Sequence, residues 1–178
     1  MSTLSPPLSE RDHVVGPEDA RVTLVEFGDF ECPHCGALHP VIQAVRKSFG
    51  GNLRFAFRHF PLRSSHPHAL AAAKAAEAAA EQGKFWEMFD RLYRRQTELT
   101  DPDLERHAQE LGLDVDRFRG SLGERAHEVR IREDLASAGA SGARGTPSLF
   151  INGELYEGGL EREEIFAALA RAAVAAVP

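Results

Sequence analysis

Residues 31–36 read Glu31-Cys32-Pro33-His34-Cys35-Gly36, and they contain the only two cysteines of the chain. Two residues between cysteines is the spacing of a redox dithiol and also of half a zinc-binding site. A structural zinc site usually needs a second such pair, which the sequence does not contain. A structural disulfide would close too short a loop to restrain the unfolded chain. The motif therefore predicts redox chemistry and no metal ion.

The flanking sequence places this motif on a turn between a strand and a helix. Residues 21–27 form a short, nearly continuous apolar run, as in a strand that is buried on both faces. Apolar residues then recur every three or four positions over residues 38–49, which predicts an amphipathic helix. Cys32 would lie at the amino terminus of this helix, where free N–H groups stabilise a thiolate. We expect an accessible Cys32 with a low pKa, and a less exposed Cys35 one turn further along.

Several separate segments together resemble the DsbA-like branch of the thioredoxin superfamily, whose active site is often Cys-Pro-His-Cys. Residues 25–27 are similar to the first active-site strand of that family, and residues 55–62 are similar to its next strand. Residues 83–89 resemble part of its helical insertion, and residues 145–153 resemble its cis-proline strand and hairpin turn. The resemblance covers residues 12–172 in order and spacing. It implies an α/β, thioredoxin-like fold with a helical insertion between the active-site half and the cis-proline strand.

This resemblance, with the pattern of apolar residues, divides the chain into three parts. Residues 1–20 are expected to form an N-terminal arm. Residues 21–62 and 146–175 would form the thioredoxin-like domain, and residues 63–145 an inserted helical domain.

The helix signals of the insertion are local. We expect a first helix from Pro67 to Gln82 that is capped by Ser64 or Ser65, because serine favours the N-cap and proline the first turn. Thr100 or Asp101 would cap a later helix. Phe85, Trp86 and Phe89 are expected to form an aromatic stripe that faces the core. Gly112 and Gly120 would divide shorter helices, and the last helix of the insertion would run from Glu124 to Ser137. Asn152-Gly153 predicts a hairpin turn.

Two residues near the dithiol are candidates for supporting roles. His34 would lie near the Cys32 sulfur, with its imidazole or its backbone favouring the thiolate; the alternative is an ordinary turn residue. Glu26 lies between apolar neighbours on the predicted strand, so its carboxyl group would have a raised pKa and relay the proton of Cys35. The alternative is a carboxylate exposed at the strand end.

Thr146 and Pro147 are the candidate substrate-binding residues. One interpretation of Pro147 is an ordinary trans proline at the start of a strand, since the cis form is the minority of X-Pro bonds. The family resemblance instead implies a cis proline that exposes the Thr146 backbone for pairing with an extended substrate segment.

These residues predict a thiol-disulfide oxidoreductase that acts on protein or small-thiol substrates and needs no cofactor. Cys32 would form the mixed disulfide and Cys35 would resolve it. A stabilised thiolate makes the disulfide a better oxidant, so oxidase ranks above reductase. Isomerase ranks lower, because no dimerisation segment is apparent. The alternative class is a redox-controlled binding protein on the same fold, either a holdase or a metal-loaded adaptor.

The dithiol and the resemblance imply thiol- or disulfide-containing protein substrates and a redox partner, and composition argues against other classes of partner. The chain has 178 residues and a formal net charge of -6, which argues against nucleic acid or an anionic membrane surface. No apolar run approaches the length that crosses a bilayer. The first residues do not resemble a secretory signal, which predicts a cytoplasmic protein as written, or a periplasmic one if a leader has been removed. The sequence leaves the oligomeric state open.

Overall fold

The structure is a computed structural model, and it describes residues 2–175. The strands are β1 (His13–Val15), β2 (Val22–Gly28), β3 (Leu53–His59), β4 (Ser148–Ile151) and β5 (Glu154–Tyr156). The helices are α1 (Pro33–Phe49), α2 (Ala69–Ala80), α3 (Phe85–Arg94), α4 (Asp101–Glu110), α5 (Val115–Leu122), α6 (Arg125–Ser141) and α7 (Arg162–Ala175), with a short 3-10 helix at Gly50–Asn52.

One five-stranded sheet, in the order β1-β3-β2-β4-β5, forms the centre of the molecule. Strands β2 and β3 are parallel, and the other pairs are antiparallel. Parallel neighbours need a crossover, and α1 provides it between β2 and β3. The mixed α/β fold predicted from the sequence is confirmed.

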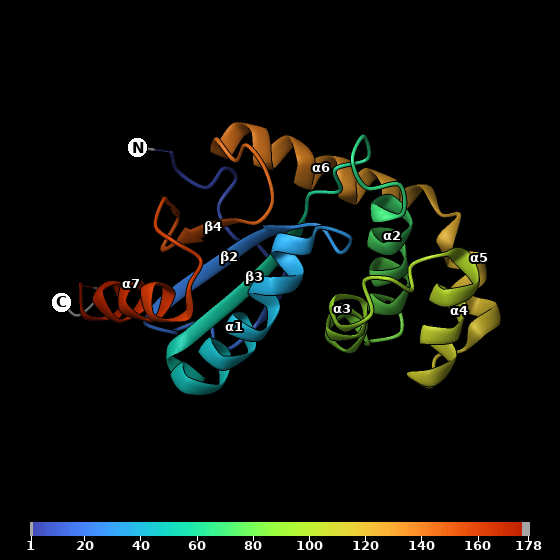
Figure 1. Cartoon of the computed structure of the whole chain (residues 1–178), viewed down its shortest axis with the longest axis horizontal. Coiled ribbons are helices and arrows are strands. Elements are labelled where there is room, and N and C mark those ends of the chain that lie inside the picture. Colours follow the sequence, from blue (N-terminus) through green and yellow to red (C-terminus); the bar gives the residue numbers. More distant parts are fainter. Residues whose placement is uncertain (1, 176–178) are drawn as a thin grey trace.

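Helices cover both faces of the sheet, and this arrangement buries β2 almost completely (Figure 1). On one face, the apolar side chains of α1, α3 and α7 pack with Leu24 and Phe55. On the other face, α6 and the N-terminal segment cover Val25, Phe27 and Phe150. Strands that are buried on both sides read as continuous apolar runs, which explains why β2 was visible in the sequence.

The helices α2 to α6 follow one another between β3 and β4, and α6 leads back over the sheet (Figure 1). The expected cap at Thr100 is correct: Thr100 and Asp103 form a capping box at the start of α4. The expected cap at Ser64 or Ser65 is wrong, because residues 62–66 form turns and α2 begins at Ala69. Gly120 does not break a helix either, since it lies inside α5.

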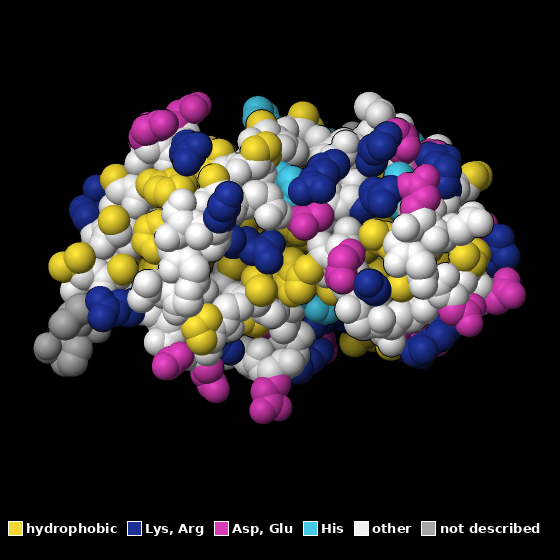
Figure 2. Space-filling view, turned by 90° about the horizontal axis from the view of Figure 1, so that it is seen from below, with side chains coloured by type: hydrophobic (Ala, Val, Ile, Leu, Met, Phe, Trp, Pro, Cys, Tyr) yellow, Lys and Arg dark blue, Asp and Glu magenta, His cyan; other side chains and the backbone are white. Residues whose placement is uncertain are grey.

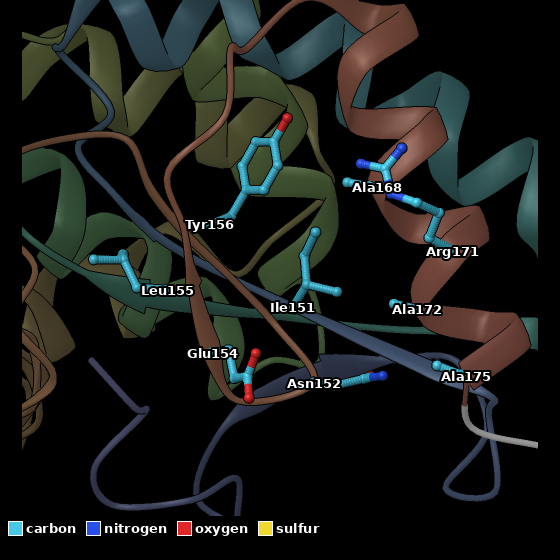
Figure 3. Close-up of a pocket in the computed structure, with 9 residues that line it drawn as sticks. All are labelled: Ile151, Asn152, Glu154, Leu155, Tyr156, Ala168, Arg171, Ala172 and Ala175. Carbon is cyan, nitrogen blue, oxygen red and sulfur yellow. The ribbon is translucent and has the colours of Figure 1, made fainter. Parts of the chain in front are cut away.

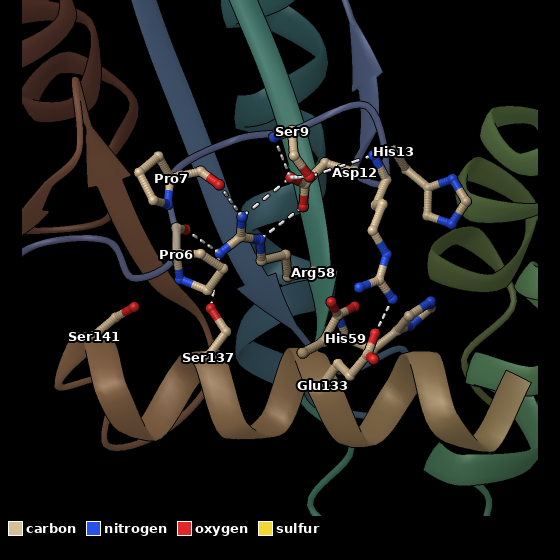
Figure 4. Close-up of polar contacts among 12 residues, drawn as sticks. Pro6, Pro7, Ser9, Asp12, His13, Arg58, His59, Glu133, Ser137 and Ser141 are labelled. Carbon is tan, nitrogen blue, oxygen red and sulfur yellow. Dashed lines mark hydrogen bonds and ion pairs between the residues drawn. The ribbon is translucent and has the colours of Figure 1, made fainter.

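The N-terminal segment is attached to the sheet by a buried arginine (Figure 4). Arg58 of β3 donates two hydrogen bonds to the carboxylate of Asp12, at 2.7 and 3.1 Å. Its guanidinium also donates to the carbonyl oxygens of Pro6 and Pro7 and to Ser137 of α6. β1 itself lies within the first twenty residues and forms the edge of the sheet next to β3. Arg58 therefore joins three segments that are distant in sequence.

The charged side chains on the face in Figure 2 are of both signs and interspersed. Among the helices of residues 2–175, none is long and apolar enough to cross a membrane.

Candidate active site

Cys32 is the N-cap residue of α1, directly after the turn that follows β2, and Cys35 lies in the first turn of that helix. Both cysteines are free thiols. Both are also buried, with 3% of Cys32 and none of Cys35 exposed. The expectation of an accessible Cys32 is therefore wrong. Cys32 belongs to the hydrophobic core, and a distant segment also contacts it, since its thiol lies 3.5 Å from the carbonyl oxygen of Thr146.

Strand pairing brings Thr146 and Pro147 to the dithiol. β4 runs antiparallel to β2, with Ser148 opposite Phe27 near the end of β2 that leads to α1. The two residues immediately before β4 therefore lie over the amino terminus of α1. The peptide bond between Thr146 and Pro147 is cis, and both side chains are half-buried.

The environments of the two thiols are strongly different. A hydrogen bond from the Cys35 thiol lowers the pKa of Cys32 to about 5, against the opposing effect of burial, and the backbone N–H groups of Cys35 and His34 add to the lowering. Burial is the main cause that raises the pKa of Cys35 far above its usual range. At neutral pH, Cys32 is a thiolate and Cys35 is a thiol.

His34 contributes through its backbone. Its side chain is exposed to solvent, whereas its N–H group is one of those that lower the pKa of Cys32. We expected either the imidazole or the backbone of His34 to favour the Cys32 thiolate, and in the structure it is the backbone N–H that does so.

Glu26 is a buried carboxylic acid beside the dithiol. Burial raises its pKa to about 8, and the negative charge of Cys32 contributes to the rise. Its carboxyl group accepts a hydrogen bond from the Tyr93 hydroxyl at 3.4 Å and adds to the raised pKa of Cys35. Gly28 leaves room for this contact, since a Cβ there would lie 2.6 Å from the Tyr93 oxygen. Glu26 is therefore protonated at neutral pH, and Tyr93 of α3 is its partner.

Gln96, which was not among the predicted site residues, holds the turn that carries Cys32. Its side-chain amide donates to the carbonyl oxygens of Phe30, at 2.9 Å, and Cys32, at 2.8 Å. Gly36 makes room for it, because a Cβ at that position would lie 2.0 Å from the Gln96 amide oxygen. A single glutamine after α3 carries no sequence signal for this contact.

Two acidic residues before Cys32 were also missed. The buried Asp29 carboxylate accepts hydrogen bonds from the backbone N–H groups of Glu31 and Leu62, each at 2.8 Å, and lies 2.7 Å from His66 Nδ1. The Glu31 carboxylate binds the backbone N–H and the ring of His68. These contacts fix the loop after β3 against the active-site turn.

Other candidate binding features lie apart from the dithiol. A cavity of about 430 Å³ opens between the β4–β5 hairpin and α7, with Tyr156 and Arg171 at its wall (Figure 3). Among residues 2–175, two groups of side chains have the spacing to hold a metal ion; their members are His13, His59 and Glu77, and Glu81, Glu124 and His127. Neither group includes a cysteine.

Comparison with known sequences identifies relatives over most of the chain. The thioredoxin family model matches residues 8–171. Na(+)/H(+) antiporter NhaA 1 of Salinispora arenicola (strain CNS-205) is 48% identical over 163 residues, which cover 92% of this chain and 25% of that protein. The chain thus spans about a quarter of the length of the curated relatives it matches.

Solved structures show the same architecture. A thioredoxin-like oxidoreductase from Silicibacter pomeroyi DSS-3 is 28% identical, with a TM-score of 0.82 over 92% of this chain and 93% of that one. The thiol-disulfide exchange protein alpha-DsbA2 from Wolbachia pipientis is 23% identical, with a TM-score of 0.79 over 95% of this chain and 89% of that one. Since the family match extends over nearly the whole sequence, the chain belongs to the thioredoxin family and has the fold of its DsbA-like members.

Proposed function

We propose that this chain is a thiol-disulfide oxidoreductase that exchanges disulfides with protein or small-thiol substrates. The observation that carries the proposal is the difference between the two thiols. Cys32 is a thiolate at neutral pH, and Cys35, beside it, is a thiol. A nucleophile and a resolving thiol need these opposite states.

In the oxidising direction, a substrate thiolate attacks Cys32 Sγ of the Cys32–Cys35 disulfide. A mixed disulfide forms at Cys32, and the bond to Cys35 breaks. A second substrate thiolate then attacks the substrate sulfur of the mixed disulfide and releases Cys32 as a thiolate. The substrate gains one disulfide, and the two electrons remain in the Cys32–Cys35 dithiol until a redox partner reoxidises it. The reducing direction reverses these steps.

The surrounding residues have supporting roles in this proposal. Glu26, which is protonated at neutral pH, supplies a proton to the departing Cys35 sulfur and takes it back in the reverse direction. The His34 backbone N–H stabilises the Cys32 thiolate. The backbone of Thr146, before Pro147, pairs with an extended substrate segment next to Cys32, in the manner of an added strand.

We infer that oxidation of substrates is the favoured direction. A lowered pKa of Cys32 stabilises the reduced, thiolate form of the protein. Stabilising the reduced form raises the reduction potential, which makes the disulfide a stronger oxidant. The same argument applies to protein and small-thiol substrates, so it does not select between them.

The test is equilibration of the Cys32–Cys35 pair against glutathione buffers, combined with trapping. We expect a potential well above that of thioredoxin, which is about -270 mV. Cys35→Ser should accumulate mixed disulfides with thiol substrates, whereas Cys32→Ser should exchange none. Full exchange by Cys32→Ser would refute the mechanism. Suppression of substrate aggregation that survives replacement of both cysteines would support the binding-protein alternative instead.

A further inference from the structure

His13, His59 and Glu77 converge at the junction between the sheet and the helical insertion. The Nε2 atoms of both imidazoles lie 2.7 Å from the same carboxylate oxygen, Glu77 Oε1. The ligand atoms of all three residues lie within 4.8 Å of one another. The three residues come from β1, β3 and α2, so only the folded chain brings them together.

The surroundings hold these side chains in place and keep the group largely dry. The exposed fraction of the side chain is 1% for His59, 10% for Glu77 and 17% for His13. The His13 ring stacks on Phe85, with 3.5 Å between the ring centroids and 9° between the planes. The backbone N–H of His59 is fixed by a hydrogen bond to Asp134 at 2.9 Å. Ligands fixed by neighbouring groups are the condition for a well-formed metal site.

The register of the sheet explains why the two imidazoles face the same way. His13 pairs with Phe57, and His59 lies two residues further along β3. Since side chains alternate between the faces of a strand, His13 and His59 project from the same face. The two histidines are also labelled in Figure 4, on β1 and at the end of β3.

We propose that His13, His59 and Glu77 form a binding site for a divalent transition-metal ion of the Zn²⁺ class. Two imidazole nitrogens and one carboxylate oxygen are ligands that Zn²⁺ takes in proteins, with water in a fourth position. His13 lies at the more exposed side of the group, which gives water access to that position. The ion would join the N-terminal segment, the sheet and α2.

The two nitrogen-to-oxygen distances need only a small adjustment to accept the ion. Ligand atoms about 2.0–2.1 Å from a tetrahedral ion lie about 3.3 Å from one another. The two nitrogen-to-oxygen distances of 2.7 Å must therefore open by about 0.6 Å. The ion then replaces the two hydrogen bonds that converge on Glu77 Oε1, and each ring nitrogen presents a lone pair in place of a proton.

This site is separate from the dithiol. None of its three ligands is a cysteine, and the ring of Phe30, two residues before Cys32, lies 6.0 Å from the ring of His59. The proposal therefore does not depend on the redox function. Its three ligands are also far apart in sequence, at positions 13, 59 and 77, so no motif spacing could reveal them.

The test uses the full chain with Cys32→Ser and Cys35→Ser, so that thiols cannot bind the added metal. Co²⁺ is titrated while the visible absorption is followed, and Zn²⁺ is added in competition. We expect visible Co²⁺ bands that saturate at one equivalent and disappear when Zn²⁺ is added. Zn²⁺ should also raise the Tm of this protein, because the ion binds the folded state alone.

Variants then locate the binding. His13→Gln keeps a hydrogen-bond donor for Glu77 but removes a metal ligand. Outer-shell changes cost about 10–100-fold in metal affinity, so loss of a ligand should cost at least about 100-fold. Glu77→Gln should have the same effect, and His127→Gln, in the second group of candidate ligands, is the matched control that should leave the affinity unchanged.

Several outcomes would overturn the proposal. They are an absence of Co²⁺ bands in the cysteine-free protein, bands that persist unchanged in His13→Gln, and bands that are lost in His127→Gln. His13 lies on the edge strand β1, and circular dichroism checks that the His13→Gln variant folds. If it does not fold, X-ray absorption of the zinc-loaded, cysteine-free protein decides the question. Two imidazoles with one carboxylate support the site, and any other ligand set refutes it.

Discussion

Between pH 5 and pH 7, the reduction potential of the Cys32–Cys35 pair should fall by about 30 mV per pH unit, and below pH 5 by about 59 mV per unit. The reason is the number of protons taken up with the two electrons. Above its pKa of about 5, Cys32 stays a thiolate on reduction, so only Cys35 binds a proton. Below pH 5, both sulfurs bind protons. The change of slope near pH 5 thus reports the pKa of Cys32.

The size of the effect at neutral pH follows from the same shift. The pKa of Cys32 is lowered from 9.0 to about 5. At a given pH below 9, only the part of this shift that lies between 5 and that pH contributes free energy to the reduced state. At pH 7 this part corresponds to at most about 3 kcal/mol in favour of the reduced folded protein, since solvent screening reduces it. For Cys32 the sign follows from its lowered pKa, because between pH 5 and pH 9 this thiol binds fewer protons in the folded chain than in the unfolded one. The contribution of Cys32 to the stability of the reduced protein therefore rises with pH, and it places the potential at pH 7 up to about 60 mV above that of an unperturbed pair.

The assay is equilibration with glutathione buffers from pH 4 to pH 7, followed by acid quenching and mass spectrometry of alkylated thiols. Thiolate absorbance of the reduced protein gives the pKa independently. Cys35→Ala removes the hydrogen bond that lowers the pKa of Cys32 most, whereas Cys35→Ser keeps a donor. The pKa of Cys32 should therefore be higher in Cys35→Ala than in Cys35→Ser. A constant slope of about 59 mV per unit through this range, or equal pKa values in the two variants, would refute the reasoning.

Three further substitutions test neighbouring features. Glu26→Gln should slow disulfide exchange and yet raise the free energy of unfolding at pH 7 by up to about 3 kcal/mol. The raised pKa of Glu26 makes the wild-type protein lose stability as pH rises from 4.5 to about 8, and an uncharged glutamine does not have this loss. Gly36→Ala should be about 2 kcal/mol less stable than the control Gly139→Ala, since it displaces the glutamine amide that makes two hydrogen bonds to the active-site turn. Arg58→Met should cost about 3–5 kcal/mol by removing the hydrogen-bonded cation of the buried Asp12 carboxylate and leaving it Arg130 at 3.9 Å, and adding Asp12→Asn should recover part of this loss.

Denaturant unfolding of the reduced proteins measures all three changes. The proposed role of Glu26 would fail if Glu26→Gln exchanged disulfides at the wild-type rate at every pH. Equal stability of Gly36→Ala and Gly139→Ala would show that the glutamine contacts contribute nothing. An Arg58→Met protein that keeps its N-terminal segment resistant to proteolysis would contradict the attachment described for Arg58.

Elements with a local physical cause could be predicted from the sequence. The strand at residues 22–28 is apolar throughout because both its faces are covered, and the helix after it begins at the proline that follows Cys32. The turn at Asn152-Gly153 needs two residues with positive φ, and these two residues supply them, at 48° and 83°. The cap at Thr100 depends on a residue only three positions away.

Features that depend on distant contacts could not be read in this way. Cys32 contacts Thr146, 114 residues later, and the sequence around Cys32 contains no sign of this contact. Gln96 contacts the active-site turn from 64 residues away. The start of α2 was misplaced because Leu62 accepts hydrogen bonds from the next residues and holds them in turns, which overrides the capping preference of serine.

The pairing of β2 with β4 has a consequence for how the protein is made. Val25 pairs with Phe150, so the sheet closes only after the whole insertion has been synthesised. The 114 positions that separate Cys32 from Thr146 take roughly 6–23 s to translate at the usual rates. During that interval the nascent chain carries two ordinary, accessible thiols, open to the oxidants and thiols around the ribosome. Closure of this high-contact-order pairing then brings Thr146 against Cys32 in a single late step.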